Sequence, residues 1–371
     1  MGKIRRIIKR MILAIVLVIS ILLLAINIPF NFYRHIESDI DYSDWMLETL
    51  SSEKRIIDIG MLGAHDAFTH QIRYGSELDL STAAAIQTGV PGALIRGFSV
   101  KQSKTQVSNV TTLLEKGVRY FDIRLTYNTT HDQWMTAHTY FSTPFDDILE
   151  DIQTFLEDHP GEFLILDIQH VNGILYDSND DFTEIKALFE DSGVLSFAYE
   201  EGIKSLDQIT YGDITNNLSQ AGVIILSKFE ETDPAFWSYG DSVRSAWANT
   251  DSEEALYTFL TEEAMTIALG AAKTGNQLSG YEGINALNGF RVMQGVLTMQ
   301  MNGEGIIEAL TSWSLLSKAR QFNPSLIAHE DFLSWMISMP IVMVDYSDSN
   351  YKEFNDALME IIIDYNENTN I

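Results

Sequence analysis

Side chains that can do chemistry recur in this chain at the ends of apolar, strand-like runs. His65 and Asp66 follow the run IIDIGML, and Arg124 ends the run VRYFDI. His138 ends the run WMTA, and Asp345 follows the run IVMV. Histidines can act as general acid and base, an arginine can stabilise an anionic oxygen, and carboxylates can orient both. This set of side chains predicts acid–base chemistry on a phosphate ester.

The elements that must position these residues alternate between two patterns. Apolar, strand-like runs cover residues 56–62, 118–125, 133–138, 163–169, 222–228, 291–299 and 340–346. Amphipathic helical patterns cover residues 45–50, 145–156, 182–189 and 354–362. Continuous apolar strands alternating with helices predict an α/β fold with a parallel sheet, which right-handed crossovers close into a barrel.

Seven strands are one fewer than a regular eight-stranded barrel needs. Either the barrel is irregular, or residues 245–290 contain a strand without a clear pattern. The fold that we expect is therefore an irregular, distorted TIM-type barrel. Residues 70–110 are rich in Ser, Thr, Ala and Gly, and they are expected to form a long excursion, either a lid over the site or a tolerated surface insertion.

The N-terminus carries five basic residues followed by an apolar run over residues 11–26, in which only Ser20 is polar. This pattern predicts a transmembrane segment or signal anchor within residues 1–28, with a cleaved signal peptide as the alternative. A linker and a leading helix are expected over residues 29–55, and the barrel over residues 56–371. The catalytic domain would then lie outside the membrane, or be secreted, in a bacterial cell envelope.

Composition excludes several classes of function. The chain has 24 Lys and Arg against 52 Asp and Glu, a formal charge of −28, which repels nucleic acid at long range. It has no cysteine, so disulfides, thiolate nucleophiles and cysteine metal sites are impossible. Nothing in the sequence points to a protein partner.

Four segments resemble phosphatidylinositol-specific phospholipase C, in particular its X-domain and its bacterial, metal-independent type. Residues 62–67, LGAHDA, resemble the family's PGTHDS element, and residues 113–124 resemble its second element. His138 with residues 155–166 is similar to the third stretch, and residues 342–346 are similar to the final strand. The resemblance spans residues 56 to about 350 and implies a distorted barrel that cleaves a phospholipid at a membrane surface.

The resemblance also implies catalytic roles. His65 would be the general base for the inositol 2-hydroxyl, and His138 the general acid for the glyceryl oxygen. Arg124 would hold a non-bridging phosphate oxygen, and Asp345 would orient His65. The remaining two catalytic candidates, Asp66 and Asp122, would tune His138 and position Arg124, with their assignment left open.

Substrate contacts follow from the resemblance less directly. Lys228 lies where the family has a basic inositol contact, and Gln169 stands where a lysine is usual. Trp247 and Asn249 match a tryptophan and an aspartate of the family. Tyr346 is a candidate to stack on the inositol ring, and simple packing in the barrel is the alternative.

An arginine beside the candidate site predicts that neither a metal nor any other cofactor is needed, because a guanidinium would occupy the phosphate side of the site and repel a cation. The alternative is a zinc or calcium site formed by His65, Asp66, Asp122 and His138. Two other functions remain open: a metal-dependent glycerophosphodiester phosphodiesterase, and a barrel that binds headgroups without turnover.

Overall fold

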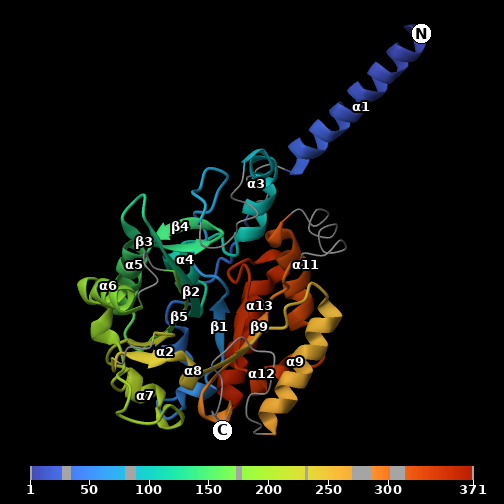
Figure 1. Cartoon of the computed structure of the whole chain (residues 1–371). Helices are drawn as coiled ribbons and strands as arrows, with labels where there is room; N and C mark the ends of the chain where they lie inside the picture. Colours follow the sequence, from blue (N-terminus) through green and yellow to red (C-terminus); the bar gives the residue numbers. More distant parts are fainter. Residues whose placement is uncertain are drawn as a thin grey trace.

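A curled parallel sheet wrapped by helices forms the body of the molecule (Figure 1). The computed structural model describes residues 2–26, 35–79, 89–172, 178–229, 233–269, 286–300 and 314–369. Along the sheet the hydrogen-bonded strand order is β7-β6-β5-β2-β1-β10-β9-β8. These strands are β1 (Met61–Ala64), β2 (Val118–Asn128), β5 (Phe163–Asn172), β6 (Gly222–Ser227), β7 (Phe236–Ser238), β8 (Val243–Ala246), β9 (Phe290–Gly295) and β10 (Ile341–Val344).

Every neighbouring pair along this path is parallel. The two end strands, β7 and β8, are joined in sequence by the short helix α8 (Tyr239–Ser242). The sheet thus has the strand number and curl of a distorted α/β barrel, and the predicted fold class is confirmed at that level.

The strand predictions were right for the long apolar runs and wrong elsewhere, and the strand at Tyr140–Pro144 was missed. β7 and β8 have only three and four residues and were missed; β8 begins just before the interval in which an extra strand was considered. β3 (Gln133–His138) does not belong to the barrel path, because it pairs antiparallel with β2 and with β4 (Tyr140–Pro144). Ile56–Asp58 forms a 3-10 helix, so the first strand starts later than predicted.

The strongest helical pattern gives α5 (Phe145–Asp158). Its apolar residues recur at spacings of three and four and are all buried, as an amphipathic helix on a sheet requires. Pro144 caps the start, where its missing N–H is harmless, and two aspartates in the first turn complement the helix dipole.

The other predicted helices are also present, as α2 (Trp45–Thr49), α6 (Ser178–Asp191) and α13 (Phe354–Asn368). The segment 70–110 was expected to lack regular structure, yet it contains α3 (Gly89–Ser103), while residues 80–88 lie outside the described residues. Apart from the N-terminal helix, the remaining α-helices in the described part of the chain are α4 (Val110–Glu115), α7 (Tyr211–Ile214), α9 (Glu253–Ala268), α11 (Leu315–Ile327) and α12 (Phe332–Ser338).

The N-terminal residues form the helix α1 (Gly2–Ile26). Within the described ranges, no helix combines the length and the apolar character needed to cross a membrane. The expected transmembrane segment is therefore not supported.

The segment that precedes the barrel is fixed to it by a buried ion pair. Arg119 of β2 donates through Nε to Glu162 at 2.7 Å, and both side chains are 0% exposed. The same guanidinium donates to the carbonyls of Tyr42 and Ser43 at 3.0 and 2.7 Å, while Glu162 accepts from the backbone N–H of Met46 at 3.1 Å. Because a charge buried without partners is costly, these bonds hold the leading segment against the amino-terminal end of the sheet.

Candidate active site

The candidate catalytic side chains lie at the carboxyl ends of neighbouring strands. β1 pairs with both β2 and β10, and β2 also pairs with β3. His65 directly follows β1, Asp345 directly follows β10, and Arg124 lies within β2. In parallel α/β folds, this edge of the sheet is where loops and strand ends build binding sites.

His65 is held from one side and faces carboxylates on the other. Its Nδ1 lies 2.8 Å from Oδ1 of Asp345. Since an ionised carboxylate can only accept a hydrogen bond, Nδ1 carries the proton of this pair. Nε2 then lies 3.6 Å from Asp66 and 4.0 Å from Asp122.

Asp66 is the carboxylate on which two histidines and Arg124 converge. Its Oδ1 forms an ion pair with Nε of Arg124, and its Oδ2 lies 3.4 Å from Nδ1 of His138 and 3.6 Å from Nε2 of His65. Asp66 itself is 1% exposed, whereas the side chains of His65, Arg124 and His138 are 18%, 32% and 27% exposed. A ligand can therefore reach the two imidazole rings and the guanidinium, while the carboxylate that orients them stays inside.

The tautomer of His138 follows from its backbone contact. Nδ1 donates to the carbonyl oxygen of Ser103 at 2.9 Å, and that oxygen can only accept. The Nε2 atom is consequently the nitrogen that is left for a ligand, and it can donate a proton when the ring is charged. Ser103 is the last residue of α3, so the helix missed in the sequence contributes directly to the site.

Charges in this cluster shift one another strongly. Burial would lower the pKa of His65, but the carboxylates of Asp66, Asp345 and Asp122 outweigh it and raise that pKa to about 9. Burial would raise the pKa of Asp66, but Arg124, His65 and His138 hold it well below its usual range. Burial and the neighbouring Asp66 instead raise the pKa of Asp122.

The backbone after β1 is strained. Asp66 and Phe68 have φ of 41° and 66°, in the left-handed region that side chains other than glycine disfavour. Asp122 stabilises this turn, because its Oδ2 accepts from the N–H of Asp66 at 3.1 Å and its carbonyl accepts from that of Ala67 at 2.7 Å. Asp122 therefore positions the turn, and Asp66 is the one that contacts Arg124 and His138.

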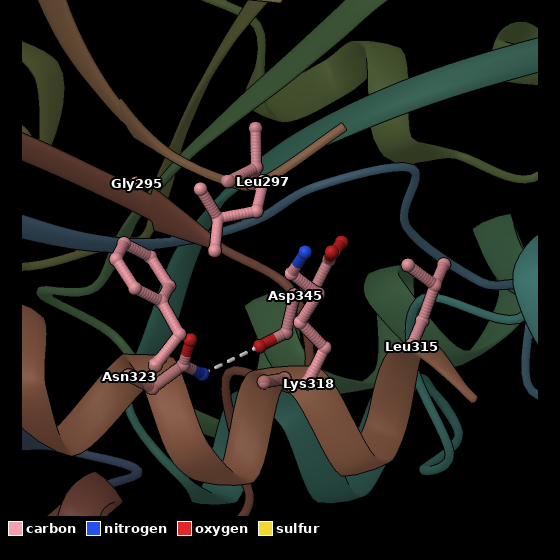
Figure 2. Close-up of a pocket in the computed structure, with 9 residues that line it drawn as sticks. Gly295, Leu297, Leu315, Lys318, Asn323 and Asp345 are labelled. Carbon is pink, nitrogen blue, oxygen red and sulfur yellow. Dashed lines mark hydrogen bonds between the residues drawn. The ribbon is translucent and has the colours of Figure 1, made fainter. Parts of the chain in front are cut away.

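Two side chains outside the predicted set fix the ends of β1 and β10. Gln106 is fully buried, and its Nε2 donates to the carbonyls of His65 and Val344 at 3.0 and 3.1 Å. Asn323 of α11 donates from Nδ2 to the carbonyl of Asp345 at 2.8 Å, beside a small, largely apolar pocket that includes Leu297 and Leu315 (Figure 2). Neither residue stands in a recognisable motif, so no local pattern could have pointed to them.

Two of the predicted substrate contacts lie close to the catalytic group. Gln169 of β5 donates from Nε2 to Asp167 at 3.2 Å. Lys228 follows β6, and its Nζ lies 4.5 Å from the centre of the Tyr239 ring. Burial lowers the pKa of Lys228, while the charges of Asp167 and Asp122 oppose that shift.

The other three predicted contacts are placed differently. Tyr346 is 0% exposed, and its hydroxyl donates to the carbonyl of Lys104, so its ring packs inside the protein, which was the alternative considered. Trp247 is 43% exposed and donates from Nε1 to Thr298 at 2.9 Å. Asn249 accepts from Gln300 through its carbonyl and its side chain, at 2.9 and 3.2 Å.

His65, Asp66 and Asp122 could also serve as a metal-ligand set. One potential ligand atom from each lies within 4.8 Å of the others, and two of the three residues are carboxylates, which hard cations favour. Arg124 is ion-paired to one of these carboxylates, and its charge opposes that of an incoming cation.

Known proteins resemble this chain in sequence, although no protein-family model matches it. PI-PLC X domain-containing protein 3 of Danio rerio is 28% identical over 232 residues, which cover 60% of this chain and 69% of that protein. Variant-surface-glycoprotein phospholipase C of Trypanosoma brucei brucei is 34% identical over 140 residues, which cover 35% of this chain and 39% of that protein.

Solved structures resemble it in fold. A mutant of the phosphatidylinositol-specific phospholipase C from Staphylococcus aureus has a TM-score of 0.53 at 16% identity, with 89% of this chain and 99% of that chain covered. The corresponding enzyme from Listeria monocytogenes has a TM-score of 0.52 at 17% identity and covers 88% of this chain and 99% of its own. In sequence, the chain is therefore similar to PI-PLC X domain-containing proteins, and in fold it is similar to phosphatidylinositol-specific phospholipase C.

Proposed function

We propose that this protein is a phosphodiesterase of the phospholipase C type, which cleaves a phosphatidylinositol-type lipid to diacylglycerol and a cyclic inositol phosphate. The observation that carries the proposal is the convergence of His65, His138 and Arg124 on the single carboxylate of Asp66. The names of the relatives, which include a phospholipase C, support the same class of substrate.

In the proposed reaction, the inositol 2-hydroxyl attacks phosphorus and its proton passes to Nε2 of His65. The bond from phosphorus to the glyceryl oxygen breaks, and Nε2 of His138 gives that oxygen a proton, so that it leaves as an alcohol. Each such proton transfer contributes roughly 10²–10⁴ in rate. Asp345 keeps His65 oriented and stabilises its charged form, as a third group does for any activated base.

Arg124 is suited to the phosphate. Its ion pair with Asp66 uses Nε, and no described residue bonds to its terminal nitrogens, so both can take the two non-bridging oxygens. The developing charge on these oxygens is then met by a cation that is already in place, which is the usual source of electrostatic stabilisation.

The test is incubation of the full chain with phosphatidylinositol vesicles in the presence of EDTA, followed by ³¹P spectroscopy. A cyclic phosphodiester signal is expected. His65→Ala and His138→Ala should each remove this signal while far-ultraviolet circular dichroism stays unchanged. His131→Ala is the matched control, because the His131 side chain is 59% exposed and, among the described residues, its ring pairs only with the surface residue Glu77. Full turnover in either active-site variant would refute the acid–base assignment.

A second candidate is a metal-dependent glycerophosphodiester phosphodiesterase, favoured only by the ligand spacing of His65, Asp66 and Asp122. The EDTA arm separates the two candidates. We expect activity to survive chelation, since Arg124 already neutralises the phosphate side of the site. Loss of activity with EDTA and its return with added Ca²⁺ or Zn²⁺ would establish the metal-dependent alternative. Headgroup binding without any phosphorus product would identify a non-catalytic barrel.

A further inference from the structure

A chain of three hydrogen-bonded side chains runs beside the catalytic group without being part of it. The hydroxyl of Tyr120 donates to Oδ2 of Asp167, and Nε2 of Gln169 donates to the same oxygen at 3.2 Å. Tyr120 and Asp167 are 0% exposed, whereas Gln169 is half-buried. The chain therefore begins in the interior of the barrel and ends at a residue that a ligand can reach.

Strand register places this chain next to the reacting groups. β2 and β5 pair so that Asp122 lies opposite Asp167. Side chains two residues apart on a regular strand point to the same face, so Tyr120 and Asp122 share a face of β2. In β5 the pairing with β2 skips Gln169, and the hydrogen bond from Gln169 to Asp167 places these two side chains next to each other. Gln169 is thus one strand away from the group formed by His65, Asp66 and Arg124.

The bond from Tyr120 holds the Asp167 carboxyl group, and the bond from Gln169 to that carboxyl group fixes the direction of the Gln169 amide. Its nitrogen is engaged with Asp167, so its oxygen Oε1 points away from that carboxyl group. Among the described residues, no donor is bonded to this oxygen. A side-chain amide held in this way offers an acceptor, and the matching ligand group is a hydroxyl.

Asp167 is also arranged to avoid a second negative charge near the phosphate. Burial and Asp122 raise its pKa to about 8, although the bonds from Tyr120 and Gln169 act in the opposite direction. Its other oxygen, Oδ1, is buried and has no hydrogen-bond partner among the described residues.

We propose that Tyr120 and Asp167 are positioning residues that hold Gln169 as the acceptor for one free hydroxyl of a polyol headgroup, beside the phosphate contacted by Arg124. This inference rests on the proposed function and adds to it the group that selects the headgroup. A headgroup lacking that hydroxyl leaves the amide oxygen without a donor and binds less tightly.

The test uses a water-soluble inositol phosphodiester and a set of monodeoxy analogues, each lacking one hydroxyl other than the attacking one. For the wild-type chain, kcat/KM should fall about tenfold on one analogue, mainly through KM, as expected for one lost hydrogen bond. The Gln169→Leu variant should cleave that analogue and the parent compound with the same kcat/KM. Tyr120→Phe should reduce the difference to about threefold, because one of the two bonds that fix Asp167 is lost.

Two further variants separate positioning from simple stability. Asp167→Asn should retain the discrimination, since its amide oxygen can accept both bonds and its nitrogen replaces the protonated oxygen. Tyr211→Phe is the matched control: it also removes a buried tyrosine hydroxyl, which donates to the carbonyl of Gly161 away from the site. It should lower stability and leave discrimination unchanged.

The outcomes are distinct. If the wild-type chain does not cleave the parent compound, the proposed function fails and this inference fails with it. If the parent is cleaved but Gln169→Leu still discriminates like the wild type, only the role of Gln169 is refuted. If Tyr211→Phe changes discrimination as much as Tyr120→Phe does, the effect is a general loss of stability and the positioning chain is refuted.

Discussion

His65, the proposed general base, is surrounded by more negative charge than such a base ordinarily needs. Three carboxylates raise its pKa to about 9, so in the free protein most of this residue is cationic at neutral pH. A base must be neutral to accept a proton, and the active fraction therefore grows as the pH rises. The same carboxylates stabilise the His65 cation once it has taken the proton, so they favour the proton transfer. They also lower the fraction of molecules in which His65 is neutral and able to start the reaction.

Asp345→Asn tests this balance. Removing one of the three charges should lower the pKa of His65, because a neighbouring anion favours the cationic ring. The acidic limb of kcat/KM, measured on a soluble phosphodiester from pH 5 to 10, should move to lower pH. The plateau should fall by about 10²-fold, because the ring loses its oriented partner. An unchanged midpoint would show that His65 is not the group that must lose a proton.

Arg124→Lys separates charge from shape. A lysine keeps the positive charge but cannot offer two parallel N–H groups to phosphate, so kcat should fall on the order of 10²-fold. Steady-state kinetics on the same substrate measures the effect. Arg55→Lys is the control, because the Arg55 side chain is 40% exposed and pairs with Asp58, which precedes β1, whereas His65 follows β1. Equal activity of the two lysine variants would argue against a bidentate phosphate contact.

At the level of single residues, the sequence predicted the groups that meet at the site, because each of them ends or follows a recognisable apolar run. It did not predict which aspartate contacts Arg124, because that depends on the strained turn at Asp66. It also missed Gln106 and Asp167, whose roles come from hydrogen bonds between segments far apart in the chain. Tyr346 illustrates the reverse error, because a strand-end tyrosine can as well face the interior.

Among the elements, the turn between α4 and β2 depends on one glycine. Gly117 has a φ of +89°, and a Cβ there would lie 2.5 Å from Sδ and Cε of Met359, a residue of α13 that is 0% exposed. Gly117 directly precedes the strand that carries Asp122 and Arg124. Its backbone conformation disfavours any residue with a side chain, and Met359 leaves no space for one.

Gly117→Ala should reduce the free energy of unfolding more than Gly202→Ala. Gly202 also has a φ of +89°, but nothing lies within 4 Å of the position that a Cβ would take there, so its substitution reports the conformational cost alone. That cost is about 1–2 kcal/mol, and the clash with Met359 should add roughly 1–3 kcal/mol for Gly117→Ala. Urea unfolding of both variants measures the difference, and equal midpoints would mean that Met359 moves aside freely.

Elements were predictable in proportion to their length and periodicity. α5 has fourteen residues with regular apolar spacing from Phe145 to Leu156, and its position agrees with the prediction to within two residues at the C-terminal end. β7 and β8 have three and four residues, too few for any period to be recognised. α3 begins in a sequence with Pro91, Gly92 and Gly97, where local propensity favours a turn.

For the whole molecule, the curled sheet brings residues 65 and 345 into hydrogen-bond contact, although 280 positions separate them in sequence. Parallel strands deliver their carboxyl ends to one edge, and this edge collects a group of buried and partly buried charges. Such a concentration of charge at one end of the barrel links the stability of the entire fold to pH.

Stability of the fold should decline between pH 6 and pH 9. The pKa of Asp167 rises from 3.8 to about 8 on folding, so from pH 4 to 8 the folded state holds a proton that the unfolded chain lacks. Raising the pH therefore favours unfolding, and the pKa of His65, raised to about 9, acts in the same direction from pH 6.5 upward.

Guanidinium unfolding at the two pH values measures the decline. Asp167→Asn has no proton to lose, so its decline should be smaller by on the order of 2 kcal/mol. The same decline in both proteins would show that Asp167 is already ionised at pH 6, because only a group that still holds its proton can contribute.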